Sequence, residues 1–555
     1  MSKEVDGRLI KVESPLTACW DTPNGALCGE FFNELKNPYY IGDQPGLTQT
    51  AGWVDAWTSA PSVYAVAAKN TTDIVAAVNF ARKNKLRLVV KGGGHSYQGT
   101  SNSADSLLIW TRAMNSVTLH DAFVGKGCEG KQAPQYAVTV QSGAIWMHTY
   151  EAVTTKGGSY VQGGGCGTVG VAGLIQSGGF GSFSKNYGIA AAGLIEAEIV
   201  TADGVARIAN ACTNPDLFWG IKGGGGGSLG VVTKVTLRTR ELPEFFGGVF
   251  GAIKAASNEA YQRLISKVIS FYQESLFNRH WGEQIVFKPG NKVDIRMVFQ
   301  GLTKLEAENV WLPFLEWLGN FPKEFSMEQP ITIAALPARF FWDAAFLKKY
   351  VPTLIGQDKR ANAPIGNIFW AGDGEEAGQI LNAYRSAWLP ASLLDKTEQN
   401  RLVDALFAST RHWSMSLHFN KGLAGAPVED IEAARNTAMN PAVLDAFALA
   451  ITASNDALAF KGILGHEPNV ARGRRNAVEV EKAMDELLKA APNAGSYVSE
   501  SNFFEPNWQR SFWGTNYPRL LGVKKKYDPD GLFFVHHGVG CEEWSEDGFV
   551  QLKSR

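Results

Sequence analysis

The sequence lacks long apolar runs and blocks of like charge. No stretch of 18 apolar residues occurs in its 555 residues, so a membrane-spanning helix is not expected. Lys and Arg number 53 and Asp and Glu number 54, which gives a formal net charge of −1. No basic cluster is present that would attract phosphates or acidic lipids. We therefore expect neither nucleic acid nor a membrane as a partner.

Cysteine is scarce, with six residues and no CxxC pair. A zinc site is therefore not predicted, and we expect no bound metal. Cys19 and Cys28 flank a loop with turn-forming residues and are either a disulfide or two buried thiols. A disulfide there, with a signal peptide removed, would indicate an exported protein. Otherwise the expected location is the cytoplasm.

Two common nucleotide-binding patterns are missing. The glycine run after Lys222 is not closed by Gly-Lys-Ser or Gly-Lys-Thr, so a P-loop is not supported. A GxGxxG turn followed about 20 positions later by an acidic residue is also poorly matched. Hydrolysis of nucleoside triphosphates and nicotinamide binding by a Rossmann fold are therefore disfavoured.

Glycine, in contrast, is abundant, and its 59 residues concentrate in Gly92–Gly94, Gly163–Gly181 and Gly223–Gly230. Glycine clusters among apolar residues favour backbone that approaches a ligand closely over a flexible linker. His95 follows the first cluster, and Cys166 lies in the second. Taken singly, the histidine is an ordinary loop residue, and the cysteine is either reactive or a buried structural thiol.

Hydrophobic periodicity predicts both helices and strands. A helix capped by Thr71 or Thr72 precedes a buried strand at 86–90, which runs into Gly92. Alternation predicts strands and a hairpin, and apolar stripes predict two more helices. The strands fall at 195–200 and 231–237, the hairpin at 284–287 and 293–299, and the helices at 261–272 and 477–487. This mixture and the chain length predict two or more domains of an α+β protein.

Four motifs in order along the chain resemble those of one family. Lys91-Gly-Gly-Gly-His-Ser-Tyr-Gln-Gly99 resembles the histidyl-FAD motif of the vanillyl-alcohol oxidase superfamily. Gly164-Gly-Cys-Gly-Thr-Val-Gly-Val-Ala-Gly173 resembles the cysteinyl-FAD motif of its berberine bridge enzyme-like branch. Asn214-Pro-Asp-Leu-Phe-Trp219 and the segment from Phe512 to Gly531 are similar to further signatures of that branch. The resemblance spans nearly the whole chain.

The resemblance implies a two-part FAD-binding domain with an inserted substrate domain, which is built on an antiparallel sheet with helices. We expect the first part of the FAD domain at 1–240, the substrate domain at 241–490 and the completing C-terminal segment at 491–555. A monomer is expected.

The resemblance also implies how FAD is held. His95 would bond to the 8α-methyl of FAD and Cys166 to its C6 atom, so the flavin would be bicovalently bound. Val169 lies where the family controls access of oxygen to the flavin, and valine there resembles oxygen-reactive members. The other predicted cofactor-binding residues are Gly92, Gly93, Gly94, Ser96, Gly99, Gly170, Gly173, Gly178, Gly179, Tyr187 and His536.

The implied activity is that of an FAD-dependent oxidase acting on a CH–OH group. An alcohol or hemiacetal, with a saccharide or oligosaccharide favoured, would pass hydride to flavin N5, and O2 would be reduced to H2O2. The alternatives are an FAD-linked dehydrogenase with another electron acceptor, or an oxidase of phenolic or alkaloid-like metabolites.

The candidate catalytic residues lie where the sequence departs from the family. Glu500 stands where a second tyrosine is common, so either Glu500 or Tyr497 is the base, or Glu500 is a surface residue. His536 and His537 replace an Asn/Gln pair. Strand alternation puts His418 on one face with Asn420, either lining the substrate side or facing solvent.

Overall fold

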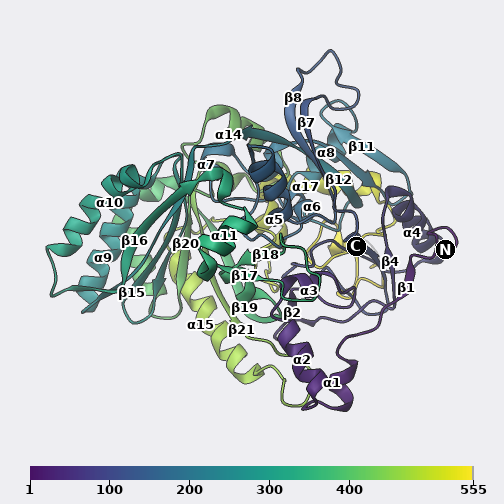
Figure 1. Cartoon of the computed structure of the whole chain (residues 1–555), viewed down its shortest axis with the longest axis horizontal. Coiled ribbons are helices and arrows are strands. Elements are labelled where there is room, and N and C mark those ends of the chain that lie inside the picture. The colour runs from purple at the N-terminus through teal and green to yellow at the C-terminus, as the bar shows by residue number, and fades with distance from the viewer. Residues whose placement is uncertain (553–555) are drawn as a thin grey trace.

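The computed structural model describes residues 1–552, whose strands form three main sheets and a two-stranded pair (Figure 1). The first sheet has the order β1-β4-β6-β5, with the last three strands parallel. Helix α4 (Thr71–Asn84) packs on it through Ile74, Val78 and Ala81, which repeat along one face of the helix. The strands are β1 (Leu9–Lys11), β4 (Tyr64–Ala67), β5 (Leu88–Lys91) and β6 (Leu107–Trp110).

The predicted cap of α4 is wrong by one residue. The side chain of Asn70, not Thr71 or Thr72, accepts the Asp73 N–H at 3.0 Å. Asn70 has extended backbone, which is the conformation of an N-cap residue, whereas Thr71 is already helical. The strand after this helix ends at Lys91 and delivers Gly92–Gly94 to the edge of the sheet.

The second sheet is antiparallel with the order β11-β10-β12-β8-β7, and β9 also pairs with β12. The predicted strands at 195–200 and 231–237 are confirmed as β10 and β12. The strands are β7 (Val117–Phe123), β8 (Gln135–Gln141), β9 (Ser159–Val161), β10 (Leu194–Val200), β11 (Ala206–Asn210) and β12 (Val231–Glu241).

The third sheet has nine strands in the order β16-β13-β15-β14-β20-β21-β19-β2-β3. All its pairs are antiparallel except β19 with β2. The predicted hairpin is confirmed, since Gln284 pairs with Arg296 across β14 and β15. The strands are β2 (Thr50–Trp53), β3 (Trp57–Thr58), β13 (Phe245–Ala255), β14 (Trp281–Lys288), β15 (Lys292–Gln300), β16 (Phe325–Pro337), β19 (Gln379–Pro390), β20 (Met415–Phe419) and β21 (Ala446–Asp456).

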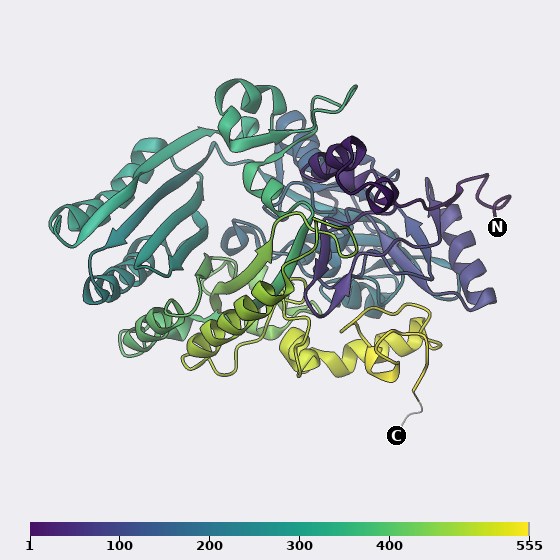
Figure 2. The same cartoon turned by 90° about the horizontal axis from the view of Figure 1, so that it is seen from below.

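Helices cover one face of this nine-stranded sheet (Figure 2). The other face is turned toward the rest of the molecule (Figure 2). Alternate strand residues such as Ile295, Met297 and Phe299 point into that helical layer and form a core with it. The predicted helices at 261–272 and 477–487 belong to this layer. The helices are α9 (Asn258–Phe271), α10 (Lys304–Gly319), α13 (Gln399–Ser409) and α15 (Val470–Leu488). The α+β fold class is therefore confirmed.

The C-terminal segment returns to the N-terminal half of the chain (Figure 1). Helices α16 (Trp508–Trp513) and α17 (Tyr517–Tyr527) follow one another there, and α17 contacts α8 (Pro215–Ile221). The indole of Trp513 donates to the Gly223 carbonyl at 3.0 Å. Buried Lys524 donates to the Ser228 carbonyl at 2.8 Å. The segment thus completes the same block that carries the glycine clusters.

Two disulfides cross-link the N-terminal half. Cys19–Cys28, one of the two alternatives left by the sequence, joins α1 (Thr17–Asp21) to α2 (Ala26–Glu34). Cys128–Cys212 joins residues 84 positions apart and was not anticipated. Cys166 and Cys541 are free thiols. No helix within residues 1–552 has both the length and the apolarity needed to cross a bilayer.

Candidate active site

One cavity of about 1560 Å³ lies where the glycine clusters, the nine-stranded sheet and the C-terminal segment meet. Its walls include Gly92–Gly94, Gly163–Gly165 and Gly225–Gly227 from the three clusters. Ligand pockets for drug-sized molecules typically span about 300–1,000 Å³. The cavity therefore has room for a cofactor and a substrate together.

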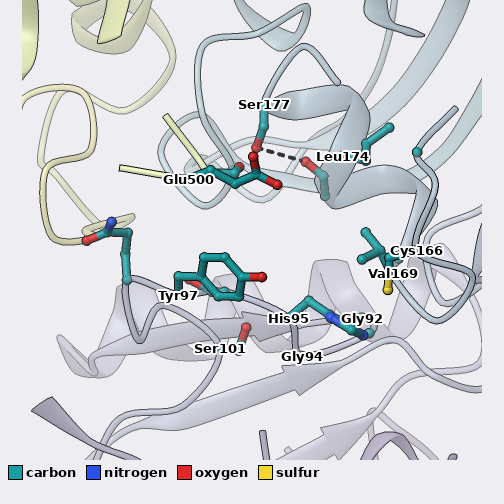
Figure 3. Close-up of a pocket in the computed structure, with 18 of the residues that line it drawn as sticks. Gly92, Gly94, His95, Tyr97, Ser101, Cys166, Val169, Leu174, Ser177 and Glu500 are labelled. Carbon is teal, nitrogen blue, oxygen red and sulfur yellow. Dashed lines mark hydrogen bonds between the residues drawn. The ribbon is translucent and has the colours of Figure 1, made fainter. Parts of the chain in front are cut away.

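His95 and Cys166 meet in this cavity although they are 71 positions apart in the sequence. A ring nitrogen of His95, the Cys166 sulfur and a Glu376 carboxylate oxygen all lie within 4.8 Å of one another. Figure 3 shows the imidazole and the sulfur directed to the same part of the pocket. The Thr168 hydroxyl lies between them, 3.1 Å from His95 Nε2 and 3.7 Å from Cys166 Sγ.

The protonation states of this pair follow from burial. Burial lowers the pKa of His95 to about 4, so its imidazole is neutral and keeps a free lone pair near pH 7. Burial, with the carboxylates of Asp373 and Glu376 nearby, raises the pKa of the Cys166 thiol well above its usual range. The cysteine is therefore a protonated thiol until a base takes its proton.

The glycine walls leave room that side chains would fill. A Cβ built on Gly173 or Gly226 meets no described protein atom within 4 Å, so it would project into the cavity. Where the loops touch one another, glycine is needed for a different reason. A Cβ on Gly93 would lie only 2.8 Å from the Gly170 backbone nitrogen. The two glycine-rich loops thus pack by backbone and present a bare surface to a ligand.

Several polar atoms on the cavity wall are buried without a partner among the described residues, and a bound ligand is one explanation for such atoms. Ser142 Oγ and Asn102 Oδ1 lie on the side of the glycine turns, and His418 Nδ1 and Glu500 Oε2 lie on the sheet side. An elongated cofactor with phosphates and a tricyclic ring system fits such a glycine-lined, partly polar cavity. The residues present therefore fit FAD better than a lone metal ion at His95, Cys166 and Glu376.

The side chain of Lys91 anchors the Gly92–Gly94 turn to a neighbouring loop. Its buried ammonium donates to the carbonyls of Gln44 at 3.0 Å, Pro45 at 2.5 Å and Leu47 at 2.8 Å. Burial lowers the pKa of Lys91 to about 7. This residue holds an adjoining loop against the turn, a role that the sequence motif alone did not reveal.

Most of the predicted cofactor-binding residues line the cavity, namely Gly92, Gly93, Gly94, His95, Ser96, Gly99, Cys166, Val169, Gly170, Gly173 and His536. Gly178, Gly179 and Tyr187 are not among its lining residues. The φ angles of the two glycines are +95° and +62°, so these residues shape a turn behind the wall. Tyr187 instead donates to Gln300 Oε1 at 3.0 Å. The residues that line the cavity therefore give no support to the prediction that these three contact the cofactor.

Glu500 and Tyr497 reach the cavity from the C-terminal segment, opposite His95 (Figure 3 labels Glu500). Burial, with Glu376 and Glu283 nearby, raises the pKa of Glu500 to about 7, although Lys421 opposes the rise. Tyr497 packs on Phe180, with ring centroids 4.7 Å apart. Burial and the nearby Glu500 carboxylate raise the pKa of its phenol, so Tyr497 stays protonated at neutral pH.

His418 lines the cavity from β20, within a cluster that the sequence did not predict. Glu283 on β14 lies 3.2 Å from Lys421 Nζ and 3.8 Å from His418 Nδ1, and accepts a hydrogen bond from Ser182. Burial and Lys421 lower the pKa of His418 to about 3, so the imidazole is neutral. Glu283 adopts φ +66°, a region that non-glycine residues rarely occupy.

The prediction that Asn420 shares a strand face with His418 is wrong. Strand β20 ends at Phe419, and Asn420 turns away with φ +58°. Its side chain is buried, accepts from the Tyr272 hydroxyl at 2.7 Å and donates to the Trp281 carbonyl at 2.7 Å. Asn420 therefore ties the strand end to the core, and Lys421 reaches the cavity in its place.

Asp373 and Glu376, on α12 (Ala371–Glu376), were also missed. Asp373 Oδ2 accepts the Gly167 N–H at 2.9 Å, and Glu376 Oε2 accepts from the Tyr97 hydroxyl at 3.1 Å. Burial and the nearby Glu376 raise the pKa of Asp373 to about 7. The segment Trp370-Ala-Gly-Asp-Gly-Glu-Glu376 shows no hydrophobic periodicity. Its high share of acidic residues was the only feature in the sequence that could have drawn attention to it.

The part of the cavity that extends over the open sheet face has an apolar wall. Its residues come from β13, β15 and β16, from the segment around α11 (Ala344–Tyr350) and from the residue just before α12. They are Phe250, Val298, Ala334, Leu336, Phe341, Trp342, Leu347, Val351, Leu354 and Trp370.

Comparison with known proteins identifies the family of this chain. The family model for the FAD binding domain matches residues 62–209, and that described as "Berberine and berberine like" matches 496–540. The FAD-linked oxidoreductase easE of Arthroderma benhamiae is 30% identical over 87% of this chain and 90% of its own length.

Solved structures share the fold. The VAO-type flavoprotein MtVAO615 of Myceliophthora thermophila C1 superposes with a TM-score of 0.77 at 24% identity, covering 99% of this chain and 95% of that one. Glucooligosaccharide oxidase of Acremonium strictum, which carries 6-S-cysteinyl, 8α-N1-histidyl FAD, gives 0.66 at 18% identity over 95% and 99%. The protein is thus an FAD-linked oxidoreductase that belongs to the berberine bridge enzyme-like branch of the vanillyl-alcohol oxidase superfamily.

Proposed function

We propose that the protein is an oxidase that holds FAD through two covalent bonds, from His95 to the 8α-methyl and from Cys166 to C6. The observation that carries this proposal is the meeting of an imidazole nitrogen and a thiol within 4.8 Å in a glycine-walled cavity. The 8α-methyl and C6 belong to the same ring of the isoalloxazine, so two side chains this close can reach both positions.

Bound FAD supplies the acceptor for the hydride of the substrate CH–OH group. The chain supplies the base. Glu500 Oε2 is buried, has no partner among the described residues and belongs to the cavity wall. A carboxyl group with a pKa of about 7 is ionised in half of the molecules at neutral pH and can accept the hydroxyl proton.

His418 orients the substrate oxygen in this proposal. Its imidazole is neutral, and its Nδ1 has no hydrogen-bond partner among the described residues, since Glu283 Oε2 lies 3.8 Å away. The ring nitrogen that carries no proton is then an acceptor for a substrate hydroxyl. Tyr497, which stays protonated, contributes its ring to the wall beside Glu500 rather than acting as the base.

We propose a saccharide or another alcohol as substrate and molecular oxygen as the electron acceptor, with H2O2 as a product. Val169 lines the cavity and leaves the passage of a small molecule less obstructed than a larger side chain would. The two disulfides support an oxidising, extracellular location.

A second substrate class is favoured by one observation, the apolar wall over the sheet face. Aromatic and aliphatic side chains there would gain more from a phenolic or alkaloid-like metabolite than from a sugar. Peroxide release with a panel of saccharides and of aromatic alcohols separates the two classes. Bleaching of the flavin by a substrate without peroxide release would instead identify a dehydrogenase.

The cofactor proposal is tested by denaturing the purified protein in acid and measuring intact mass. Wild type, His95→Ala and Cys166→Ala should each keep FAD mass and yellow colour in the precipitate. The double variant should release both. A colourless wild-type precipitate with yellow supernatant would refute covalent attachment.

A further inference from the structure

The surroundings of Cys166 pose a chemical problem for its bond to the flavin. Only a thiolate is a strong nucleophile, yet this thiol is buried beside two carboxyl groups that disfavour the thiolate. The charged groups with the largest effect on its ionisation are Asp373 and Glu376, and both disfavour the thiolate. Formation of the bond therefore requires a group that removes the proton as the sulfur reacts.

Asp373 is placed to be that group. Its Oδ2 atom is fixed by the N–H of Gly167, the residue that follows Cys166, at 2.9 Å. Asp373 and Cys166 both line the cavity, and Asp373 is the charged group that most raises the pKa of the thiol. Because one oxygen is held by the backbone N–H of the residue after Cys166, the carboxylate is fixed against this loop and retains a second oxygen.

Glu376, the other nearby carboxyl group, is engaged differently. It accepts from the Tyr97 hydroxyl at 3.1 Å, and burial raises its pKa. Its role is to hold Tyr97 and to keep Asp373 basic, since the two carboxyl groups repel each other when both are ionised. Thr168 contacts both anchors, so its hydroxyl sets the position of the imidazole relative to the sulfur.

We propose that Asp373 accepts the proton of the Cys166 thiol as the sulfur bonds to the flavin. This inference rests on the proposed bicovalent FAD. It adds a residue that assists formation of the Cys166 link.

The chemistry balances with oxygen as the oxidant. The S–H bond breaks and its proton goes to Asp373 while a bond forms between sulfur and the flavin carbon. The hydrogen on that carbon leaves as a proton, and the electron pair of its C–H bond stays on the flavin. Molecular oxygen takes these two electrons with two protons and becomes H2O2. One thiol, one FAD and one O2 thus give one thioether-linked FAD and one H2O2.

The test uses Asp373→Asn in the full-length protein. Asparagine keeps an oxygen acceptor for the Gly167 N–H but is not a base, so the local structure is retained. Protease digestion and mass spectrometry give the fraction of chains with flavin on Cys166 and, separately, on His95. We expect the Cys166-linked fraction to fall at least tenfold while the His95-linked fraction is unchanged. Asp373→Glu should restore part of the Cys166 link.

Glu375→Gln is the matched control, since Glu375 is an exposed residue of the same helix. It should carry both links as wild type does. In a His95→Ala background, Asp373→Asn should release its flavin on denaturation, whereas His95→Ala alone should not. A Cys166-linked fraction in Asp373→Asn equal to that of wild type overturns the role of Asp373. Wild type without flavin on Cys166 overturns the bicovalent cofactor itself, which is a different failure.

Discussion

The ammonium of Lys421 lies 3.2 Å from the carboxylate of Glu283, inside the cavity and beside His418. Burial alone would raise the pKa of Glu283, but Lys421, His418 and Ser182 outweigh it, and the pKa is lowered. The left-handed backbone at Glu283 costs roughly 1–3 kcal/mol. The protein tolerates this conformational cost at Glu283, the residue that places a negative charge on the substrate side of the site.

Removing Lys421 alone should destabilise the protein. Lys421→Met leaves Glu283 buried without its cation, and breaking such a pair costs about 3–5 kcal/mol. The double variant Glu283→Gln/Lys421→Met should regain most of that loss, because no buried charge remains. Urea denaturation of wild type, Lys421→Met, Glu283→Gln and the double variant measures the coupling.

The exposed pair Arg435–Glu432 provides the control for this cycle. Arg435→Met should change the free energy of unfolding by no more than about 1 kcal/mol. Equal losses from Lys421→Met and Arg435→Met would show that Lys421→Met does not leave Glu283 as an uncompensated buried charge.

Glu500→Gln should abolish most of the activity. General-base catalysis typically contributes about 10²- to 10⁴-fold, so kcat should fall by that range. In wild type, the base must be ionised, and its pKa is raised to about 7, so kcat/KM should rise with pH through about 7 and level off above it. The variant should lose this rise. Steady-state rates between pH 5 and 9 measure both effects.

Glu505→Gln is the control for Glu500, because Glu505 lies in the same segment but is not a lining residue of the cavity. It should keep the wild-type pH profile. A profile of Glu500→Gln that still rises through pH 7 would assign the base to another group. His418 would not be that group, since its pKa is lowered to about 3.

Sequence patterns predicted the parts of the fold that depend on local periodicity. The helices at 71–84 and 258–271 and the hairpin of β14 and β15 were found because apolar residues repeat along them. Strand β2 was missed, since its four residues, all buried, show no alternation and pair in parallel with β19, more than 300 positions away. Only long-range pairing makes that segment a strand.

The candidate site likewise contains residues that a sequence motif predicts and residues that only the fold brings together. The resemblance marked His95 and Cys166 because each stands in a glycine-rich motif, and the structure brings them together. Glu283, Asp373 and Glu376 stand in no motif, and they matter because strand β14 and helix α12 bring them to the cavity. Tyr187 follows a glycine-rich stretch, yet it lies behind the wall and is bonded to Gln300.

The two disulfides should differ in their contribution to stability. Cys128–Cys212 closes a loop of 84 residues and Cys19–Cys28 one of 9. The chain-entropy model predicts that the longer loop contributes about 2 kcal/mol more. Cys128→Ser/Cys212→Ser should therefore lower the free energy of unfolding more than Cys19→Ser/Cys28→Ser. Both variants should keep their flavin, since none of the four cysteines lines the cavity. Equal losses from the two variants would contradict the loop-length argument.

Phe250 offers a direct test of what lies on the apolar wall. Its side chain is 41% exposed on β13 and lines the cavity opposite Arg296 of β15. Because 41% of the side chain is already exposed, Phe250→Ser should lower the free energy of unfolding by no more than about 2 kcal/mol. Full burial of a phenylalanine gains about 1.5–3 kcal/mol, and a ligand can cover only the exposed 41%, so KM for a substrate with an aromatic extension should rise roughly three- to eightfold. The kcat should stay unchanged, since Phe250 would contact the aromatic extension of the substrate and not its reacting group.

Leu305→Ser changes another exposed apolar residue, 65% exposed on α10 and outside the cavity wall, and is the control that should leave KM unchanged. A saccharide substrate makes few apolar contacts, so its KM should respond to Phe250→Ser by less than about twofold. The ratio of the two responses therefore identifies which substrate class uses the wall. If Phe250→Ser and Leu305→Ser leave the KM of every substrate of the enzyme equal to that of wild type, this face of the sheet does not bind substrate.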